Sequence, residues 1–433
     1  MNKFGYRFRL MMAYRDALRT RLPFLYKRMI DNAHNRAVAA AHRLKDKDRI
    51  EVAFLLTIPG MWKLDYVFKL MQQSGRYHPY VVIYPYSQFK GFDKKELSNT
   101  VRRTEDFIKQ RGFEYVIPYD EKTGTWNDIR KSLNPDIVFF TTPYRDILPS
   151  YYYYNFKDKL TCYVPYSFLT LNLYKLNYNQ ISVNLFGLNF AETDMHLEFA
   201  KKYSPTHGRN FVATGYPGIE VYSRNDYVSP DVWRQQETTK KRVIWAPHHT
   251  IDDSDNFQIS TFLIFCETMQ QLAKEYAGSI QFAFKPHQLL KFKLEKLWGV
   301  ERTEDYYRFW AETPNCQLEE SGYVDLFIHS DAMIHDSGSF TSEYLCLGKP
   351  VMFLIQGSDA EKQFNDFGVM AFRQHYHGKT VDDIRHFLDN VVLRGDDPMR
   401  ASRDAFKHQY LGPRDGLLPS QCIMNAIEDM ING

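Results

Sequence analysis

Residues 331–355 read DAMIHDSGSFTSEYLCLGKPVMFLI, and this stretch decides the fold of the second half of the chain. Residues 332–334 are a short apolar segment, and the polar turn 336–339 follows it at once. Asp, Ser and Gly favour turns and helix N-termini, and residues 340–347 repeat large apolar side chains at helical spacing. Gly348 and Pro350 end that helix, and residues 351–355 are apolar throughout, as in a buried parallel strand. The stretch therefore predicts a strand, a tight turn, a helix and a second strand.

The turn of this unit has the chemistry of an anion site. A helix N-terminus presents free backbone N–H groups and a partial positive charge, which suits a phosphate or diphosphate. Glu343 lies one helical turn further on, where a carboxylate can accept hydrogen bonds from both hydroxyls of a ribose. The alternative is an ordinary capped helix in an α/β domain. The expected contacts to a nucleotide in this stretch are Asp336, Ser337, Gly338, Ser339 and Glu343.

Three earlier segments repeat the pattern of an apolar strand that runs into a turn: NFVATGYP at 210–217, RVIWAPHHT at 242–250 and QFAFKPH at 281–287. In open α/β sheets ligands bind outside the carboxyl ends of the strands, where these turns lie. Lys285 can serve as a point charge for phosphate, and His287 can donate to a diphosphate oxygen or shuttle a proton. His248 is expected to hydrogen-bond to the same ligand.

The order of these motifs over roughly residues 204–357 resembles the CDP-glycerol glycerophosphotransferase family of teichoic-acid and capsule polymerases. The DSGS turn with Glu343 also resembles the nucleotide site of UDP-N-acetylglucosamine 2-epimerases, which share the GT-B architecture. The resemblance implies an α/β fold with two Rossmann-type domains, parallel sheets and a cleft between them. It also implies an active-site role for His287. One departure is that residues 163–167 read YVPYS where the family has Trp-His-Gly, whose His is taken as the catalytic base.

The missing histidine leaves the acceptor hydroxyl without an obvious base. Asp65, in the loop after the first strand, is the candidate, although a solvated first-turn residue of a helix is the simpler interpretation of it. His248 and His249 invite a metal hypothesis with Asp252 and Asp253 nearby. Adjacent residues on one turn seldom converge on an ion, so no metal and no cofactor are expected beyond a nucleotide-activated donor.

Composition sets the domain count and the charge balance. A chain of 433 residues is too long for one ordinary hydrophobic core, and its 44% hydrophobic residues suffice for the cores of two domains. Five scattered cysteines argue for a reducing compartment. Residues 1–50 carry 13 Lys and Arg against four Asp, whereas the whole chain carries only +3, so the remainder is net negative. No apolar run is long enough for a transmembrane helix, and no signal peptide is visible.

These features predict four regions: a basic amphipathic arm (1–49), an acceptor domain (50–205), a nucleotide-donor domain (206–395) and C-terminal helices (396–433) that pack back across the domains. The arm alternates aromatic and leucine residues with arginines, so it is expected to bind an anionic membrane surface. A helix packed on the domain is the alternative, and nucleic acid is not expected. The tyrosine run 151–154, with Tyr144 and Arg145, either faces a sugar or polyol acceptor or forms a buried aromatic loop.

Three functions from different classes remain open on the sequence. The first is a transferase that moves glycerol phosphate or a sugar from a nucleotide donor to a cell-surface polysaccharide or lipid-linked acceptor. It would work in the cytoplasm, on the inner face of the membrane. The second is a nucleotide-sugar epimerase or hydrolase that uses the same site. The third is a non-catalytic polymer-assembly factor, for which the missing Trp-His-Gly argues.

Overall fold

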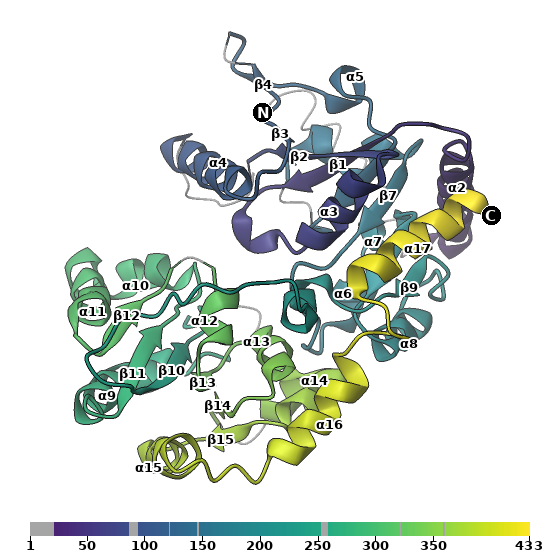
Figure 1. The fold of residues 1–433 in the computed structure, drawn as a ribbon. Coiled ribbons are helices and arrows are strands. Elements are labelled where there is room, and N and C mark those ends of the chain that lie inside the picture. Colours follow the sequence, from purple (N-terminus) through teal and green to yellow (C-terminus); the bar gives the residue numbers. More distant parts are fainter. Residues whose placement is uncertain are drawn as a thin grey trace. The chain divides into compact units, whose positions relative to one another are not determined.

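The chain folds into two compact α/β units, each built on a parallel sheet (Figure 1). The computed structural model describes residues 21–85, 94–120, 122–144, 147–252, 259–320, 322–357 and 360–433. The first unit contains the described residues up to Ser167 together with Leu173–Glu220 and Pro413–Gly433, and the second contains Phe168–Asn172 and Val221–Gly412. The expected pair of Rossmann-type domains is thereby confirmed. Arg145, Asp253 and residues 1–20 of the arm lie outside the described residues.

The first unit holds a seven-stranded sheet in the order β3-β2-β1-β6-β7-β8-β9. All of its paired strands are parallel. Its strands are β1 (Ile50–Leu56), β2 (Tyr77–Ile83), β3 (Tyr115–Val116), β6 (Ile137–Phe140), β7 (Leu160–Tyr163), β8 (Leu188–Ala191) and β9 (Phe211–Ala213). A short antiparallel pair, β4 (Tyr119–Asp120) and β5 (Thr125–Trp126), stands apart from it. Buried apolar clusters cover both faces of the sheet, as a parallel sheet requires.

The helical segments of the first unit are α2 (Pro23–His42), η1 (Pro59–Met61), α3 (Asp65–Ser74), α4 (Lys94–Lys109), α5 (Ile129–Ser132), η2 (Pro149–Tyr151), η3 (Tyr153–Phe156), α6 (Tyr174–Tyr178), α7 (Ile181–Leu185), α8 (Asp194–Tyr203) and α17 (Pro419–Asn432). The 3-10 segment η4 (Pro217–Ser223) runs from the first unit into the second. The predicted boundary at residue 205 is therefore too early, because β9 pairs with β8 in the first sheet.

The second unit holds a six-stranded sheet in the order β12-β11-β10-β13-β14-β15, again with parallel pairs. Its strands are β10 (Lys241–Ala246), β11 (Ile280–Phe284), β12 (Cys316–Leu318), β13 (Ala332–His335), β14 (Val351–Leu354) and β15 (Tyr376–Gly378). Its helical segments are α9 (Phe262–Glu275), α10 (Leu290–Trp298), α11 (Val300–Glu312), α12 (Val324–Ile328), α13 (Phe340–Glu343), η5 (Tyr344–Leu347), η6 (Ala360–Gln363), α14 (Asp366–Phe372), α15 (Val381–His386), the π-helix η7 (Phe387–Leu393) and α16 (Arg400–Tyr410). The strand, turn, helix and strand predicted for 331–355 are all present.

The C-terminal region divides between the two units. Helix α16 belongs to the second unit, whereas α17 belongs to the first and packs against α2 and α3 (Figure 1). Glu220 fixes the start of α17, because its carboxylate accepts hydrogen bonds from the backbone N–H and the hydroxyl of Ser420, both at 2.7 Å.

The second half of the basic arm is a packed helix and not a free one. Helix α2 buries a stripe of mostly small side chains against the first unit, at Tyr26, Ile30, Ala33, Ala37, Ala40 and Ala41. The Tyr26 hydroxyl accepts a hydrogen bond from Asn184 at 2.8 Å, and Arg209 pairs with Asp31 at 2.8 Å. For residues 23–42 the structure therefore shows the alternative expectation, a helix packed on the domain, and the arm predicted over 1–49 does not extend through them.

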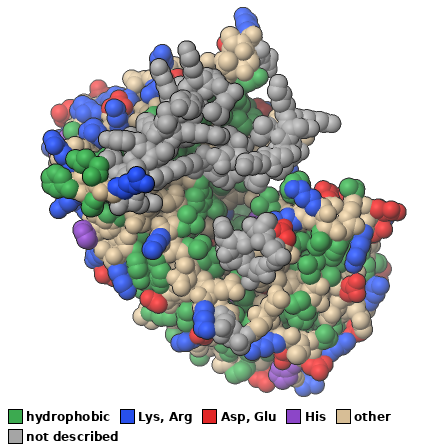
Figure 2. Space-filling view, turned by 180° about the vertical axis from the view of Figure 1, so that it is seen from behind, with side chains coloured by type: hydrophobic (Ala, Val, Ile, Leu, Met, Phe, Trp, Pro, Cys, Tyr) green, Lys and Arg blue, Asp and Glu red, His purple; other side chains and the backbone are tan. Residues whose placement is uncertain are grey.

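Charge on the described surface is mixed. On the face that Figure 2 shows, Lys and Arg side chains lie among Asp and Glu side chains and among exposed hydrophobic ones. Among the helices that the structure describes, none is both long and apolar enough to cross a membrane.

We expect Ala37→Leu to lower the free energy of unfolding by about 1–3 kcal/mol, the usual range for overpacking a core. The reason is that the Ala37 methyl already lies 3.0 Å from the position a Cβ on Gly187 would take. The matched control is Ala39→Leu on the exposed face of the same helix. Urea unfolding of both variants checks this, and equal midpoints would show that α2 is not packed as described.

Candidate active site

The candidate site lies at the carboxyl ends of the strands in the second sheet. Strands β10 and β13 are neighbours in the middle of the sheet. The chain continues from β10 to β11 and β12 on one side, and from β13 to β14 and β15 on the other side. Such a switch point leaves a crevice where ligands of open α/β sheets bind. The two turns that meet there carry His248 after β10 and Asp336 after β13, and Lys285 and His287 follow the adjacent β11.

Three histidines gather at this edge. The ring centroid of His287 lies 5.0 Å from that of His248 and 4.2 Å from that of His249, and ring nitrogens of all three fall within 4.8 Å of one another. Burial lowers the pKa of His287 well below its usual value, and the neighbouring histidines and Lys285 lower it further. Burial also lowers the pKa of His248 well below its usual value, and the neighbouring His249 lowers it further. Both rings are therefore neutral at pH 7.

Hydrogen bonding fixes which nitrogen of His287 carries the proton. Its Nδ1 accepts the backbone N–H of Leu289 at 3.1 Å, so in the neutral ring Nε2 is protonated and donates. A metal-bound histidine has the opposite pattern, because it donates one N–H to a neighbour and offers the other nitrogen's lone pair to the ion. His287 thus fits an anion better than a cation. Asp252, the described carboxylate of the metal hypothesis, pairs with Lys293 at 3.3 Å.

The carboxylate of Asp336 anchors this edge through hydrogen bonds to the turn after β10 and to the start of α9. Its side chain is 1% exposed and accepts backbone N–H groups from His248 and from Thr261, both at 2.5 Å. It also accepts the hydroxyls of Thr261 at 3.0 Å and Ser260 at 3.2 Å. The carboxylate sits at the N-terminus of α9, where negative charge is favoured. These bonds make Asp336 a positioning residue for the His248 turn, and its predicted contact with the nucleotide stays a prediction.

The serine turn is buried and internally bonded. The Ser337 amide donates to Nδ1 of His335 at 3.1 Å, and its hydroxyl lies 3.3 Å from that of Ser339. A Cβ on Gly338 would meet Leu171 at 3.3 Å, and the Gly338 carbonyl accepts the Thr170 hydroxyl at 2.7 Å. Because Gly338 has no side chain, residues 168–172 can approach this turn closely. The helix begins at Phe340, so its first N–H groups lack intrahelical partners.

Glu343 and Lys285 are both buried. Glu343 is 1% exposed and accepts a hydrogen bond from the Tyr323 hydroxyl. Lys285 is 9% exposed at the end of β11, where its backbone N–H donates to Trp245 at 2.8 Å. Lys285 follows the carboxyl end of β11, whereas Glu343 is the last residue of α13, one helical turn after the serine turn.

Asp65, the predicted base, is a paired carboxylate in the first unit, and its role as a base stays a prediction. The Asp65 carboxylate accepts from Arg111 at 2.9 Å and from the Trp62 indole at 3.1 Å, at the first turn of α3. The simpler interpretation of Asp65 is thus the better one. Tyr163 ends β7 and opens the segment 163–167, which stands where the family has Trp-His-Gly. Burial raises the pKa of Tyr163 well above its usual value.

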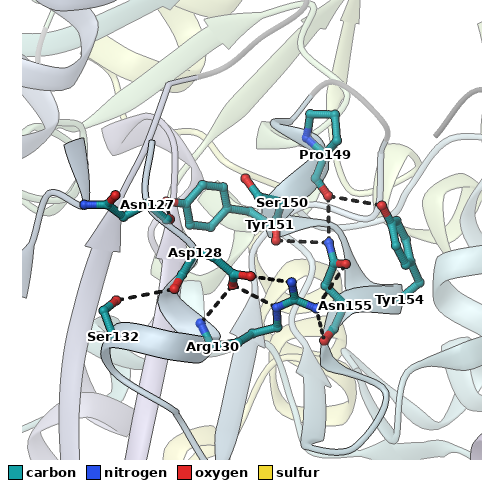
Figure 3. Close-up of polar contacts among 9 residues, drawn as sticks. All are labelled: Asn127, Asp128, Arg130, Ser132, Pro149, Ser150, Tyr151, Tyr154 and Asn155. Carbon is teal, nitrogen blue, oxygen red and sulfur yellow. Dashed lines mark hydrogen bonds and ion pairs between the residues drawn. The ribbon is translucent and has the colours of Figure 1, made fainter. Parts of the chain in front are cut away.

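The tyrosine run is a buried aromatic loop, and not a surface open to an acceptor. Tyr151, Tyr152 and Tyr153 are at most 4% exposed. The Tyr151 hydroxyl donates to the Asn127 carbonyl at 2.7 Å (Figure 3). The Tyr151 ring stacks on that of Tyr84, with ring centroids 4.7 Å apart.

Comparison with known proteins gives a family and a fold. The sequence model of the family described as CDP-Glycerol:Poly(glycerophosphate) glycerophosphotransferase matches residues 186–429, more than half of the chain. A solved structure of the wall teichoic acid polymerase TagF is 15% identical, with 100% of this chain and 99% of that chain covered and a TM-score of 0.54. The structure of a TagF variant soaked with CDPG has the same identity, the same coverage of both chains and the same TM-score.

Epimerases have a similar fold. The putative UDP-N-acetylglucosamine 2-epimerase of Listeria monocytogenes is 15% identical, with 88% of this chain and 96% of that chain covered and a TM-score of 0.53. The S. aureus MnaA-UDP structure is 14% identical, covers 88% of this chain and 97% of that chain, and has a TM-score of 0.54. These likenesses show the GT-B-type fold. No curated protein matches the chain.

We expect Asp336→Ala to lower the free energy of unfolding by about 2–4 kcal/mol, because it leaves several buried donors without an acceptor. Burial raises the pKa of Asp336 to about 6, against its hydrogen bonds, from an ordinary value of 3.8. The folded state therefore holds the proton more tightly, so this group stabilises most below pH 4 and less as the pH rises through 6.

Urea unfolding at pH 4.5 and 7.5 measures both effects. The difference in the free energy of unfolding between wild type and Asp336→Ala should be smaller at the higher pH. Asp331→Ala, at the partly exposed start of β13, is the matched control. A gap that widens with pH would contradict the raised pKa.

Proposed function

Because the chain belongs to the CDP-glycerol:poly(glycerophosphate) glycerophosphotransferase family, we propose that it transfers glycerol phosphate from CDP-glycerol to a teichoic-acid-like or capsule polymer. In this reaction the acceptor hydroxyl attacks the phosphorus that carries glycerol. A phosphodiester forms, the phosphoric anhydride bond breaks, CMP leaves, and the hydroxyl proton is released. A sugar donor and a lipid-linked acceptor are the variants of the same proposal.

The observation that carries the proposal is the hydrogen bond from the Leu289 N–H to Nδ1 of His287, beside His248 and His249 at the switch point of the second sheet. This bond leaves Nε2 of the neutral ring as the donor. These residues lie within the span that the family matches. Neutral donors in a buried site stabilise the charge that develops on a leaving phosphate, without a metal. Lys285 adds a positive charge, and the N-terminus of the helix after the serine turn adds further donors.

The direct test is release of CMP from CDP-glycerol with and without a poly(glycerol phosphate) primer. We expect release only with the primer. His287→Gln should lower the rate by about 10²–10³, the usual cost of one transition-state donor. His386→Gln, on the exposed face of α15, is the matched control and should leave the rate unchanged.

Two outcomes would contradict the proposal. Nucleotide release or isomerisation of UDP-sugars without a primer would indicate an epimerase or hydrolase. Tight binding of CDP-glycerol without any turnover would indicate a non-catalytic assembly factor.

We also propose that the enzyme works on the inner face of the cell membrane, attached through the N-terminal part of the chain. Support comes from the start of α2, where Leu22, Phe24 and Leu25 are 50%, 76% and 41% exposed. The exposed residues Arg21, Lys27 and Arg28 lie among them. Apolar side chains beside basic ones suit the boundary of an anionic bilayer.

Co-sedimentation with vesicles of anionic phospholipid tests this attachment. Replacing Leu22, Phe24 and Leu25 by Ser should reduce the bound fraction severalfold, with unchanged thermal stability because the three side chains are exposed. The control replaces Leu297 and Val300, exposed on the second unit, in the same way. Equal sedimentation of the two variants would place the attachment elsewhere.

A further inference from the structure

Two histidines of the second unit lie side by side in its core. His335 ends β13 and His375 precedes β15, and their ring centroids are 5.2 Å apart. Both rings pack edge-on against Phe353 of β14, the strand between β13 and β15 in the sheet. The two side chains are 0% and 2% exposed, and burial lowers the pKa of each well below its usual value, to about 3 for His335. Both rings are therefore neutral at pH 7, with one nitrogen-bound proton each.

Hydrogen bonds assign the proton of each ring to one nitrogen. Nδ1 of His335 accepts the backbone N–H of Ser337 at 3.1 Å, so the proton of His335 is on Nε2. Nδ1 of His375 lies 2.9 Å from the carbonyl oxygen of Ala371, in α14. Because a carbonyl oxygen only accepts, His375 has its proton on Nδ1 and a lone pair on Nε2. The two neighbouring rings are thus opposite tautomers.

The second nitrogen of each ring is buried and has no hydrogen-bond partner among the described residues. In His335 this nitrogen is a donor, and in His375 it is an acceptor. Buried polar groups of native proteins are nearly always hydrogen-bonded, since an unsatisfied one is unfavourable. A centroid separation of 5.2 Å is short enough for a direct N–H···N hydrogen bond once the two nitrogens point toward each other.

We propose that Nε2–H of His335 donates to Nε2 of His375, and that this bond makes both histidines positioning residues for the candidate site. The bond completes a chain of donors and acceptors. Ser337 donates to His335, and His335 donates to His375. His375 in turn donates to Ala371. Bonds in such a chain strengthen one another in the low dielectric of a core, so the turn 336–339 is tied to α14.

The turn that this chain holds contains Asp336. His335 and Ser337 are its two neighbours in sequence, and the hydrogen bond between them fixes the backbone on both sides of Asp336. The Asp336 carboxylate accepts the backbone N–H of His248. A His335 ring that His375 holds in place therefore also helps to hold the turn after β10. The effect on a bound nucleotide rests on the proposed function, whereas the hydrogen bond itself does not.

Long-range ¹⁵N–¹H correlation NMR of the imidazole-labelled full chain at pH 7 tests the bond without a ligand. We expect an Nε2–H signal for His335, an Nδ1–H signal for His375, and a scalar coupling between their Nε2 atoms across the hydrogen bond. The same tautomer in both rings, or no coupling, would overturn the proposal. These signals of the wild type decide the bond even where a variant does not fold.

Two variants test the positioning role. His375→Phe keeps a ring and removes the acceptor, whereas the amide of His375→Gln can still donate to Ala371 and accept from His335. In His375→Phe the Ser337 amide hydrogen should exchange about two- to tenfold faster, and CDP should bind about two- to tenfold more weakly in calorimetry, as expected for one neutral hydrogen bond. His375→Gln should restore most of both values.

His377→Gln is the matched control. His377 is exposed, and its Nε2 lies 3.1 Å from the carbonyl oxygen of Phe372 at the end of the same helix, so its substitution should change neither value. If His375→Phe leaves both values as in wild type, or if His375→Gln is as defective as His375→Phe, the positioning role is wrong. If wild type does not bind CDP, the proposed function fails, and the exchange of the Ser337 amide then decides the positioning role.

Discussion

The carboxylate of Asp336 joins three parts of the second unit that are far apart in sequence. It accepts the His248 amide from the turn after β10 and the Thr261 amide from the start of α9, while its own backbone ends β13. A buried carboxylate is tolerated only when its lone pairs are satisfied, so these donors must hold their positions as long as the charge is there. These hydrogen bonds fix the geometry of the switch point of the sheet, and with it the positions of the histidines.

Burial then sets the chemistry of the site. Burial lowers the pKa of His287 most, and the two neighbouring rings and Lys285 lower it further, so the ring stays neutral with its proton on Nε2. A neutral donor costs little to bury and can still bond a phosphate oxygen. Glu343 adds a buried acceptor on the next helical turn, where it already accepts a hydrogen bond from the Tyr323 hydroxyl. The binding of a diphosphate and a diol at this edge stays a prediction.

Much of this could be predicted from the sequence, where local patterns were strong. The strand, turn and helix of 331–355 and the placing of His248, Lys285 and His287 at strand ends all followed from apolar runs that end in turn residues. The anchoring role of Asp336 could not, because its partners Ser260 and Thr261 carry no local signal that they meet it.

Two other differences have physical reasons of their own. Helix α2 carries alanines at 33, 37, 40 and 41, a narrow helical stripe of small residues, yet its arginines suggested an exposed helix. Long basic side chains on the outer face do not prevent an alanine face from packing closely. The domain boundary was placed too early because β9 is only three residues long, too short for its pairing with β8 to show in the sequence.

The central claim is that the folded site holds His287 as a neutral ring with the proton on Nε2. Long-range ¹⁵N–¹H correlation NMR of imidazole-labelled protein, titrated between pH 5 and 8, reports the charge and the tautomer of each ring. The account predicts a neutral Nε2–H signal for His287 across this range, which shifts when CDP is added. A charged ring at pH 7, or a proton on Nδ1, would contradict it.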